Sequence, residues 1–322
     1  MSAPLVSVVI PAYRAAAHLP ETVARLARQD FADFEVVIVE DGSGDGTADV
    51  ARDLERRFER VRAVVLPQNG GVARARQRAV AEATGEYLWF VDADDAWPDD
   101  ALHTLVRLAQ DTGADVAVAG AEFVYQDGAR RALPAPRSEP VSGHEAFRML
   151  LRGELTGHLW NKLFRRSVMR QASFAPARVQ SDLVMVADAL SHAGRVAFAP
   201  ATVYEYRLRS GSIITSTSKR AESLAIIDAA VRADAERLGL AASEDYRYFR
   251  ARYIQLSGIK DALLAAYEPA ERASHLRARR RALGVSDVWL FARRRDARRF
   301  ALAATAKASV RAHRALLKVA ER

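Results

Sequence analysis

Two short apolar runs near the N-terminus, with a helical pattern between them, constrain the fold of this chain more than any other feature. Val6–Ile10 and Phe34–Val39 have the length and composition of buried strands, and Ala17–Gln29 between them carries apolar residues at helical spacing. Strands joined through a helix form a βαβ unit, in which they lie parallel in one sheet. Because parallel sheets bind ligands at the carboxyl ends of their strands, we look for functional residues there.

Small, aromatic and acidic residues follow the first two predicted strands. They are Pro11, Ala12 and Tyr13 after the first strand, and Glu40, Asp41, Gly42 and Ser43 after the second. A third predicted strand, Val61–Leu66, leads into Gly70 and Gly71, which permit a tight turn before a helix with alternating arginines that include Arg76. We expect the three strand ends to converge on one crevice.

A fourth apolar run leads straight into a cluster of carboxylates in the sequence GEYLWFVDADDAWP. Tyr87–Val91 predicts a buried strand, so Asp92, Asp94 and Asp95 should project from its carboxyl end. Carboxylates in that position can bind a hard cation such as Mg²⁺ or Mn²⁺. The alternative is an acidic helix cap before Pro98.

Together these segments resemble the inverting family 2 glycosyltransferases. The matching words are VSVVIPAY, EDGSGDGT, NGGVARAR and FVDADD, in this order and spacing. The resemblance is strongest over roughly the first hundred residues and continues more faintly to about Ile213. It implies an α/β GT-A fold, Rossmann-like, with a mostly parallel central sheet flanked by helices, to which the composition adds an α-helical C-terminal region.

The resemblance implies roles for residues at the crevice. The donor-binding positions would be Pro11, Ala12, Tyr13, Glu40, Asp41, Arg76, Asp92 and Ala93. Pro11–Tyr13 would pack against the nucleobase, Asp41 would hydrogen-bond the base or ribose, and Arg76 would face the phosphates. Asp94 would be the direct ligand of Mn²⁺ or Mg²⁺, and Asp92 would contact the ribose or metal-bound water.

The resemblance also points to a catalytic base. In the word QSDLVMVADAL, Asp182 occupies the position of the family's base, although Ser181 replaces the usual preceding glutamate. Glu40 and Gln77 also depart from the family's words, where aspartate and asparagine are usual, and this weakens any inference about which nucleotide is read. The alternative role for Asp182 is an N-cap at the start of a predicted helix.

Further candidates lie on the acceptor side of the crevice. Trp160, Asn161 and Lys162 would line the acceptor or the diphosphate, although tryptophan in an apolar segment usually packs in the core. Relatives use the region after the strand-like TVYEYRLR as a mobile flap. The flap and diphosphate candidates are Lys162, Arg207, Arg209 and Ser212, against the alternative of a surface loop with solvated arginines. His158 has no spaced partner and is expected to be structural.

Length and composition bound the organisation of the chain. Its 322 residues suffice for an α/β domain and a further helical region. The α/β domain is predicted at 1–216, with a nucleotide half at 1–97 and an acceptor half at 98–216, and the helical region is predicted at 217–322.

The absence of cysteine excludes disulfides, zinc–thiolate sites and cysteine nucleophiles. With no signal peptide and no apolar run of membrane-spanning length, we expect a cytoplasmic protein, peripheral to the inner face of the membrane at most. The irregular stretch Gln126–Gly143 predicts a surface excursion.

Positive charge is concentrated near the C-terminus. From Leu276 onward there are fourteen basic residues against three acidic ones, a net charge of +11, so the rest of a chain whose net charge is +8 is slightly acidic. Aromatic and leucine residues among these arginines, at 289–291 and 300, could meet an anionic membrane surface, an anionic acceptor polymer or a second copy of the chain in a homo-oligomer. They could also pack the helices together. No nucleic-acid recognition fold is present, so nucleic acid is not expected as a partner.

The sequence thus predicts a metal-dependent inverting glycosyltransferase. It would move a sugar from a nucleotide diphosphate donor, UDP-sugar by default, to a hydroxyl of a bacterial cell-surface glycan, a teichoic-acid-like polyol phosphate polymer or a lipid-linked precursor. Two alternatives use the same crevice. One is an inactive nucleotide-sugar-binding relative, and the other is a nucleotidyl or phosphoryl transferase.

Overall fold

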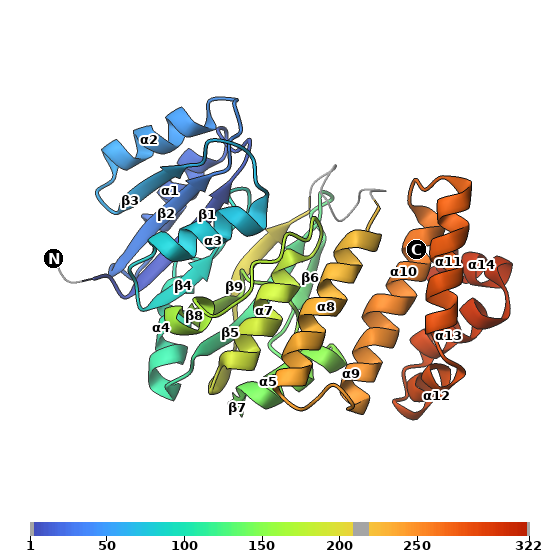
Figure 1. Cartoon of the computed structure of the whole chain (residues 1–322). Coiled ribbons are helices and arrows are strands. Elements are labelled where there is room, and N and C mark those ends of the chain that lie inside the picture. The colour runs from blue at the N-terminus through green and yellow to red at the C-terminus, as the bar shows by residue number, and fades with distance from the viewer. Residues whose placement is uncertain (1–2, 209–218, 321–322) are drawn as a thin grey trace. The chain divides into compact units, whose positions relative to one another are not determined.

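The computed structural model describes residues 3–208 and 219–320. The described residues form two compact units. The first contains residues 3–147, 155–176 and 180–208, and the second contains residues 148–154, 177–179 and 219–320. Figure 1 shows the strands in the first unit and helices alone in the C-terminal part of the chain.

The first unit begins with the predicted alternation of strands and helices. Its elements are β1 (Val6–Ala12), α1 (Leu19–Leu26), β2 (Phe34–Glu40), α2 (Thr47–Arg57), β3 (Val61–Val65), α3 (Val72–Glu82) and β4 (Tyr87–Phe90). The strands lie in the order β3-β2-β1-β4 and all pair in parallel. Because β1 lies between β2 and β4 and is almost wholly buried, its mostly apolar sequence is what the fold requires. The predicted βαβ arrangement is confirmed.

Beyond β4 the pairing becomes mixed. The later strands are β5 (Val116–Val124), β6 (Arg130–Leu133), β7 (Val141–Ser142), β8 (Lys162–Arg165) and β9 (Arg195–Arg207). Strand β8 is antiparallel to both β4 and β5, whereas β9 runs parallel to β5. The parallel half of the sheet therefore contains the strands predicted for the nucleotide side. Strand β9 begins more than one hundred residues after the end of β4, yet it belongs to the same sheet. Strands β6 and β7 fall within the stretch Gln126–Gly143, most of which is exposed, as predicted.

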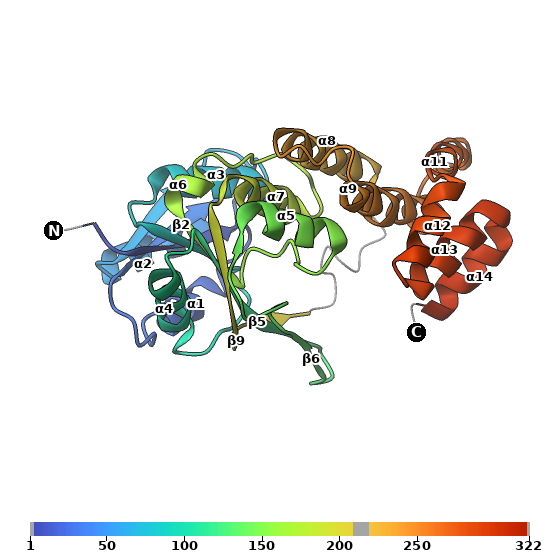
Figure 2. The ribbon, with the colours of Figure 1, turned by 90° about the horizontal axis from the view of Figure 1, so that it is seen from below.

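Helices cover both faces of the sheet (Figure 2). Helices α1 and α4 (Ala101–Thr112) lie on one face, and α3, α6 (Arg166–Met169) and α7 (Ser181–His192) lie on the other. Alternate residues of β1, Val6, Val8 and Ile10, pack in one core with apolar residues of α1 and α4. The expected α/β fold with a central sheet between helices is confirmed.

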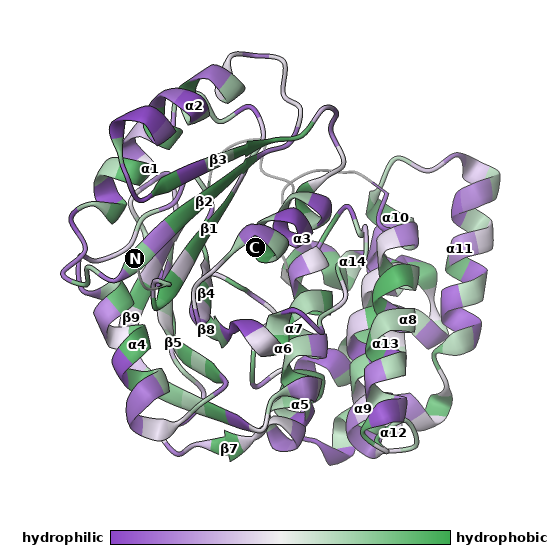
Figure 3. Cartoon of the chain, turned by 60° about the vertical axis from the view of Figure 1, so that its left-hand side comes forward, coloured by the Kyte–Doolittle hydropathy of each residue, from purple (hydrophilic) through white to green (hydrophobic). Residues whose placement is uncertain are grey.

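The second unit is helical. Its helices are the C-terminal part of α5 (Gly143–Arg152), then α8 (Ala221–Arg237), α9 (Glu244–Phe249), the π-helical turn η2 (Arg250–Leu256), α10 (Ser257–Leu264), α11 (Pro269–Ala282), α12 (Val285–Arg293), α13 (Ala297–Ala308) and α14 (Val310–Ala320). Figure 3 shows apolar residues concentrated in the strands and mixed polar and apolar faces on these helices. Of the aromatic candidates there, Phe291 is fully buried with Leu290, whereas Trp289 is 61% exposed and Phe300 is 36% exposed. No described helix is long and apolar enough to cross a membrane.

Candidate active site

The loops that follow β1, β2 and β3 are tied together by one carboxylate. Asp41 follows β2, and its own N–H donates to the carbonyl of Ala12 at the end of β1 over 2.8 Å. Its two carboxylate oxygens accept hydrogen bonds from the backbone N–H groups of Gly70 and Gly71, at 2.9 and 2.8 Å. Asp41 is almost fully buried. Both oxygens of this predicted nucleotide-binding residue are therefore engaged in shaping the crevice.

Glu40 closes the turn that follows β2. One of its carboxylate oxygens accepts from the N–H of Gly42 at 3.1 Å and the other from the N–H of Ser43 at 2.6 Å. Gly42 has a φ of +65°, and a Cβ added there would lie 2.5 Å from the carbonyl carbon of Gln68. Only glycine allows the two loops to approach so closely. The longer side chain, which stands where the resembling family usually has aspartate, thus folds back onto its own turn.

Tyr13 presents an aromatic ring at the end of β1. Its side chain is 47% exposed, whereas Ala12 beside it is buried. The loop is held in place because the N–H of Arg14 donates to Oγ of Ser43 at 2.9 Å. An exposed ring on an anchored loop at a strand end can stack on a planar ligand such as a nucleobase.

The carboxylates that follow β4 divide into two groups. Asp92 and Asp94 are partly exposed, with Ala93 between them. Asp95 is 3% exposed and accepts hydrogen bonds from the hydroxyl of Tyr204 and the N–H of Arg207, both at 2.9 Å. The expectation that Asp95 joins a cation-binding cluster was wrong. Its side chain points inward and holds the end of β9 against the loop.

Arg76 joins Asp182, the predicted base, to Asp92, a predicted donor-binding and metal residue. One terminal nitrogen of its guanidinium donates to Oδ1 of Asp182, and the other lies 3.3 Å from Oδ1 of Asp92. The Arg76 side chain is 5% exposed, against 32% for Asp92 and 24% for Asp182. Burial lowers the pKa of Arg76, but the two carboxylates outweigh it and raise that pKa overall. Arg76 therefore holds these two side chains together from the buried side of the crevice.

Negative charge exceeds positive charge around Asp92. Burial is the main cause that raises its pKa to about 6, and the carboxylates of Asp182 and Asp94 raise it further against the opposing effect of Arg76. Asp182 lies in the first turn of α7, after Gln180, which occupies the cap position with a left-handed backbone, φ 62°. Asp182 is therefore not the N-cap residue, and its carboxylate faces Arg76 instead.

A stack of aromatic rings forms one wall beside these carboxylates. Trp160 stacks on His158 at 4.6 Å, on Tyr204 at 4.9 Å and on Tyr206 at 5.7 Å between ring centroids. The hydroxyl of Tyr204 accepts from the N–H of Asp92 at 3.0 Å. Burial raises the pKa of Tyr206, and the carboxylates of Asp95, Asp92, Asp94 and Asp182 raise it further. Sequence reasoning missed both tyrosines, although their alternation in YEY predicts a strand with the two rings on one face.

Lys162 does not occupy the expected place. It is the first residue of β8, it is fully buried, and its ammonium donates to the carbonyl of His158 at 2.6 Å and to Oδ1 of Asn161 at 2.9 Å. Burial lowers its pKa to about 7. An enclosed ammonium cannot meet a diphosphate directly, so the expected contact was wrong. Asn161 is also buried and donates to the carbonyl of Ala119 at 2.7 Å.

Of the predicted flap residues, Arg207 is described at the end of β9. Its side chain is exposed, and its backbone N–H is fixed by Asp95. Arg209 and Ser212 lie outside the described residues.

The residues present fit a hard cation that also contacts a ligand. Among the described residues, no group of three or more His, Asp or Glu side chains is arranged to hold a metal ion by itself. Mg²⁺ and ions like it are commonly bound through one or two carboxylates, with substrate phosphates completing the coordination. Asp92 and Asp94, in a crevice with surplus negative charge, match that donor set.

Comparison with known proteins identifies the family. Residues 7–172 match the model for glycosyl transferase family 2. TuaG of Bacillus subtilis, whose name assigns it to teichuronic acid biosynthesis as a glycosyltransferase, is 30% identical over 221 residues, which cover 68% of this chain and 85% of TuaG.

Solved structures show the same fold. S. aureus TarS 1-349 in complex with UDP-GlcNAc superposes with a TM-score of 0.71 at 20% identity, covering 98% of this chain and 91% of that chain. The mannosyltransferase PcManGT of Pyrobaculum calidifontis, in complex with GDP-Man and Mn²⁺, has a TM-score of 0.52 at 19% identity and covers 98% and 87% of the two chains. The match over residues 7–172 spans both the donor-side loops and the carboxylates after β4. Because of this match, the chain belongs to glycosyl transferase family 2.

Proposed function

We propose that this glycosyltransferase moves a sugar, with inversion at the anomeric carbon, from a nucleotide diphosphate donor to an acceptor hydroxyl, and that it requires Mn²⁺ or Mg²⁺. The observation that carries the proposal is the bridge formed by Arg76. It brings Asp182, the candidate base, into one cluster with Asp92, the candidate donor and metal residue.

The donor would bind across the strand ends of the parallel half of the sheet. Tyr13 offers a ring for the nucleobase, Pro11 and Ala12 shape the strand end beneath it, and the loop organised by Asp41 offers backbone groups for the ribose. A UDP-sugar is the default donor, since TarS, which shares this fold, is seen with UDP-GlcNAc. Arg76 would act on the donor through the two carboxylates that it positions.

Asp182 would take the proton of the acceptor hydroxyl. As that proton moves to its carboxylate, the acceptor oxygen bonds to the anomeric carbon, and the bond from that carbon to the diphosphate oxygen breaks. The nucleoside diphosphate leaves with the bonding electrons. A single displacement from the opposite face inverts the configuration at the anomeric carbon.

Asp94, with Asp92, would hold the divalent cation at the diphosphate. When bound, such an ion offsets the charge that develops on the leaving group. Arg207, exposed at the end of β9 with its backbone N–H held by Asp95, would approach the diphosphate from the acceptor side.

The acceptor would be a bacterial cell-surface glycan, a polyol phosphate polymer or a lipid-linked precursor. The name of TuaG refers to teichuronic acid, which supports this class. The helical region, predicted at 217–322, would contribute through its basic surface, where exposed Trp289 could meet an anionic membrane at the inner face, the polymer itself or a second copy of the chain.

A donor panel tests the proposal. UDP-, GDP-, dTDP- and CDP-sugars are titrated with and without Mn²⁺ while the thermal midpoint of the protein is followed. We expect one nucleotide to stabilise the protein only when metal is present. The products of the same mixture then decide the chemistry. Release of nucleoside diphosphate supports glycosyl transfer, release of pyrophosphate indicates nucleotidyl transfer, and no response to any donor indicates an inactive relative.

A further inference from the structure

Arg131, Phe123 and Tyr206 form a row across three neighbouring strands of the sheet. Phe123 of β5 pairs with Arg131 of β6 on one side and with Tyr206 of β9 on the other. Paired residues on adjacent strands project from the same face of a sheet. Adjacent strands lie ~4.8 Å apart, so roughly 10 Å separates the backbones of Arg131 and Tyr206. That span suits one substituted sugar or polyol unit.

The side chains of this row are held against one another. The guanidinium carbon of Arg131 lies 4.7 Å from the centre of the Phe123 ring, and the ring of Tyr206 meets that ring edge-on at 5.8 Å between centroids. Phe123 is buried, whereas Arg131 is exposed and Tyr206 is half-buried. A guanidinium that stacks on an aromatic face keeps its N–H groups available at the edge. The row therefore presents positioned polar groups on an aromatic base.

The row lies beside the loop that carries the candidate donor and metal carboxylates. The backbone N–H and carbonyl of Glu205 are hydrogen-bonded to the backbone of Ala96, at 2.7 and 3.2 Å. The N–H of Arg207 donates to the carboxylate of Asp95 at 2.9 Å. Tyr206 is held between these two anchored residues, which places its end of the row at the crevice.

Arg131 carries a charge that no carboxylate offsets among the described residues. Its neighbour Arg130 projects from the opposite face of β6 and is balanced by Glu122 at 2.7 Å and Glu205 at 2.8 Å. The two arginines therefore differ in the charge that they can offer to a ligand, although they are adjacent in sequence.

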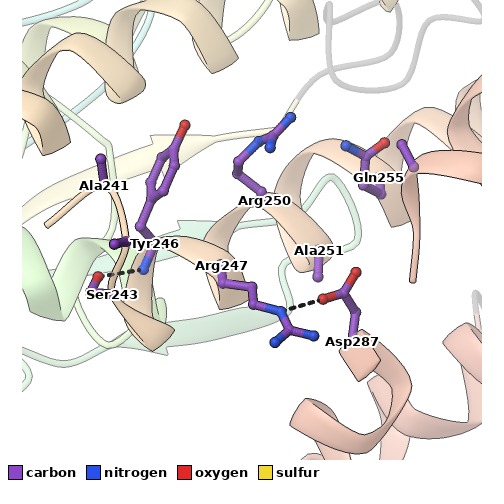
Figure 4. Close-up of a pocket in the computed structure, with 10 residues that line it drawn as sticks. Ala241, Ser243, Tyr246, Arg247, Arg250, Ala251, Gln255 and Asp287 are labelled. Atoms are coloured by element: carbon purple, nitrogen blue, oxygen red, sulfur yellow. Dashed lines mark hydrogen bonds and ion pairs between the residues drawn. The ribbon is translucent and has the colours of Figure 1, made fainter. Parts of the chain in front are cut away.

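Arginines in the pocket of the helical unit resemble Arg130 and not Arg131. In Figure 4, Nε of Arg247 donates to Asp287, over 2.7 Å. Arg250 in the same pocket donates through two nitrogens to Asp228, at 2.9 and 3.1 Å. Because these guanidiniums are already paired, that pocket is a poorer match for an anion than the row on the sheet.

The imidazole of His158 is influenced by charges on both sides of the crevice. Burial is the main cause that lowers its pKa to about 4, and the cations of Lys162 and Arg131 lower it further, while Asp182 raises it. His158 also packs edge-on against Phe123 at 5.8 Å between centroids. The row thus belongs to the wall that also feels the candidate base.

The polar groups of the row select a particular chemistry. A guanidinium binds a phosphate or a carboxylate through parallel N–H groups, and more strongly than it binds a neutral oxygen. The hydroxyl of Tyr206 has no hydrogen-bond partner among the described residues. Burial and the carboxylates of the crevice raise its pKa, so the hydroxyl keeps its proton and can donate to a sugar or polyol hydroxyl.

We propose that Arg131 and Tyr206 form an acceptor subsite for a sugar or polyol unit that bears an oxyanion, either a phosphate or a carboxylate. Arg131 binds the oxyanion, and Tyr206 donates to a hydroxyl of the same unit. The carboxylates of the crevice repel an anionic acceptor, and Arg131 supplies the cation that offsets this repulsion. The identification of the ligand as acceptor rests on the proposed function, whereas the binding of oxyanions rests on the row alone.

Ligand-observed NMR with the full chain, in metal-free buffer, tests this inference. The probes form two pairs that differ in charge, glucuronate with glucose and ribitol 5-phosphate with ribitol. We expect the anionic member of at least one pair to bind saturably and more tightly than its neutral counterpart. The pair that responds tells whether the subsite takes a carboxylate or a phosphate.

Three variants locate the binding. Arg131→Met removes the guanidinium but keeps an unbranched chain over Phe123, and Tyr206→Phe removes only a hydroxyl. We expect the anionic probe to bind about ten- to hundredfold more weakly to the first and about two- to tenfold more weakly to the second. Arg130→Met removes the same charge from the same strand on the opposite face, and this matched control should bind the probe as the wild type does. Thermal midpoints verify that all variants are folded.

The inference is overturned if no anionic probe binds saturably, or if the neutral probes bind as tightly. It is equally overturned if either subsite variant binds the anionic probe as the wild type does, or if Arg130→Met weakens binding as much as Arg131→Met. Weaker donor binding by Arg131→Met would assign Arg131 to the donor and overturn the acceptor subsite. Asp182→Asn separates the two proposals, because it should abolish release of nucleoside diphosphate while leaving probe binding intact.

Discussion

Arg76 and Asp182 lie 106 positions apart in the sequence, yet the guanidinium of the first donates a hydrogen bond to the carboxylate of the second. The contact joins α3 to the first turn of α7 at the carboxyl edge of the sheet. The same guanidinium also reaches Asp92 after β4. Three segments remote in sequence thus meet around one buried cation, which sets the spacing of the two carboxylates.

Removing that cation should destabilise the fold. Arg76→Met leaves Asp92 and Asp182 facing each other without compensation, and we expect a loss of about 2–4 kcal/mol in the free energy of unfolding, somewhat below the ~3–5 for fully buried pairs because both carboxylates still reach water. Urea denaturation measures it. Arg78→Met, on the same helix but 51% exposed in its pair with Glu82, should cost less than about 1 kcal/mol. Equal losses in the two variants would refute the special position of Arg76.

Asp94 and Asp95 are neighbours with different expected roles. Asp94→Ala should abolish the Mn²⁺-dependent part of donor binding, measured by calorimetry, and change the thermal midpoint of the ligand-free protein little. Asp95→Ala leaves the Tyr204 hydroxyl and the Arg207 N–H without their acceptor, which should cost about 1–3 kcal/mol of stability. If Asp94→Ala binds donor as before in the presence of Mn²⁺, its assignment as metal ligand is wrong.

Gly42 and Gly44 offer a test of the close approach between loops. Both have a positive φ, +65° and +67°, so alanine at either position should cost about 1–2 kcal/mol in backbone strain. A Cβ at Gly44 meets nothing within 4 Å, whereas one at Gly42 collides with the backbone of Gln68. We therefore expect Gly42→Ala to be the more destabilising change and to weaken donor binding as well. Similar denaturation midpoints for the two variants would contradict this packing.

His158 should make stability depend on pH in the acidic range. Burial, with the Lys162 ammonium beside it, lowers its pKa from 6.5 to about 4. The unfolded chain therefore binds a proton that the folded chain does not between those two values, and stability should fall as pH drops through that window. His158→Phe can keep the stack on Trp160 and should flatten this part of the profile. Parallel profiles for variant and wild type, from urea midpoints, would show that His158 is not the cause.

The order of elements in the donor half could be predicted because each signal there is local. Apolar runs such as Val6–Ile10 are long enough to define a buried strand, and parallel strands place their ends at one edge whatever follows. This is why Asp92 could be placed at the crevice from the sequence, whereas Asp182 was named only through the resemblance to the family. Their connection through Arg76 could not be predicted from the sequence, because a buried ion pair between α3 and α7 leaves no local pattern.

The wrong predictions for Asp95 and Lys162 also arise because tertiary contacts leave no local pattern in the sequence. Asp95 and Lys162 look like site residues from their neighbours in sequence, but a side chain's direction depends on tertiary partners, here Tyr204 for one and His158 with Asn161 for the other. Likewise, four apolar residues among arginines could not be sorted by sequence. The structure buries Leu290 and Phe291 and leaves Trp289 and Phe300 exposed.

Asp182→Asn tests the central claim most directly, because it keeps the shape of the side chain and removes its capacity to accept a proton. Donor affinity and the rate of nucleoside diphosphate release are measured in the same preparation, with the nucleotide identified by the donor panel. We expect donor affinity within a few-fold of wild type and a rate reduced by about 10²–10⁴, the usual contribution of a general base. A variant that releases nucleoside diphosphate at the wild-type rate would show that Asp182 is not the base.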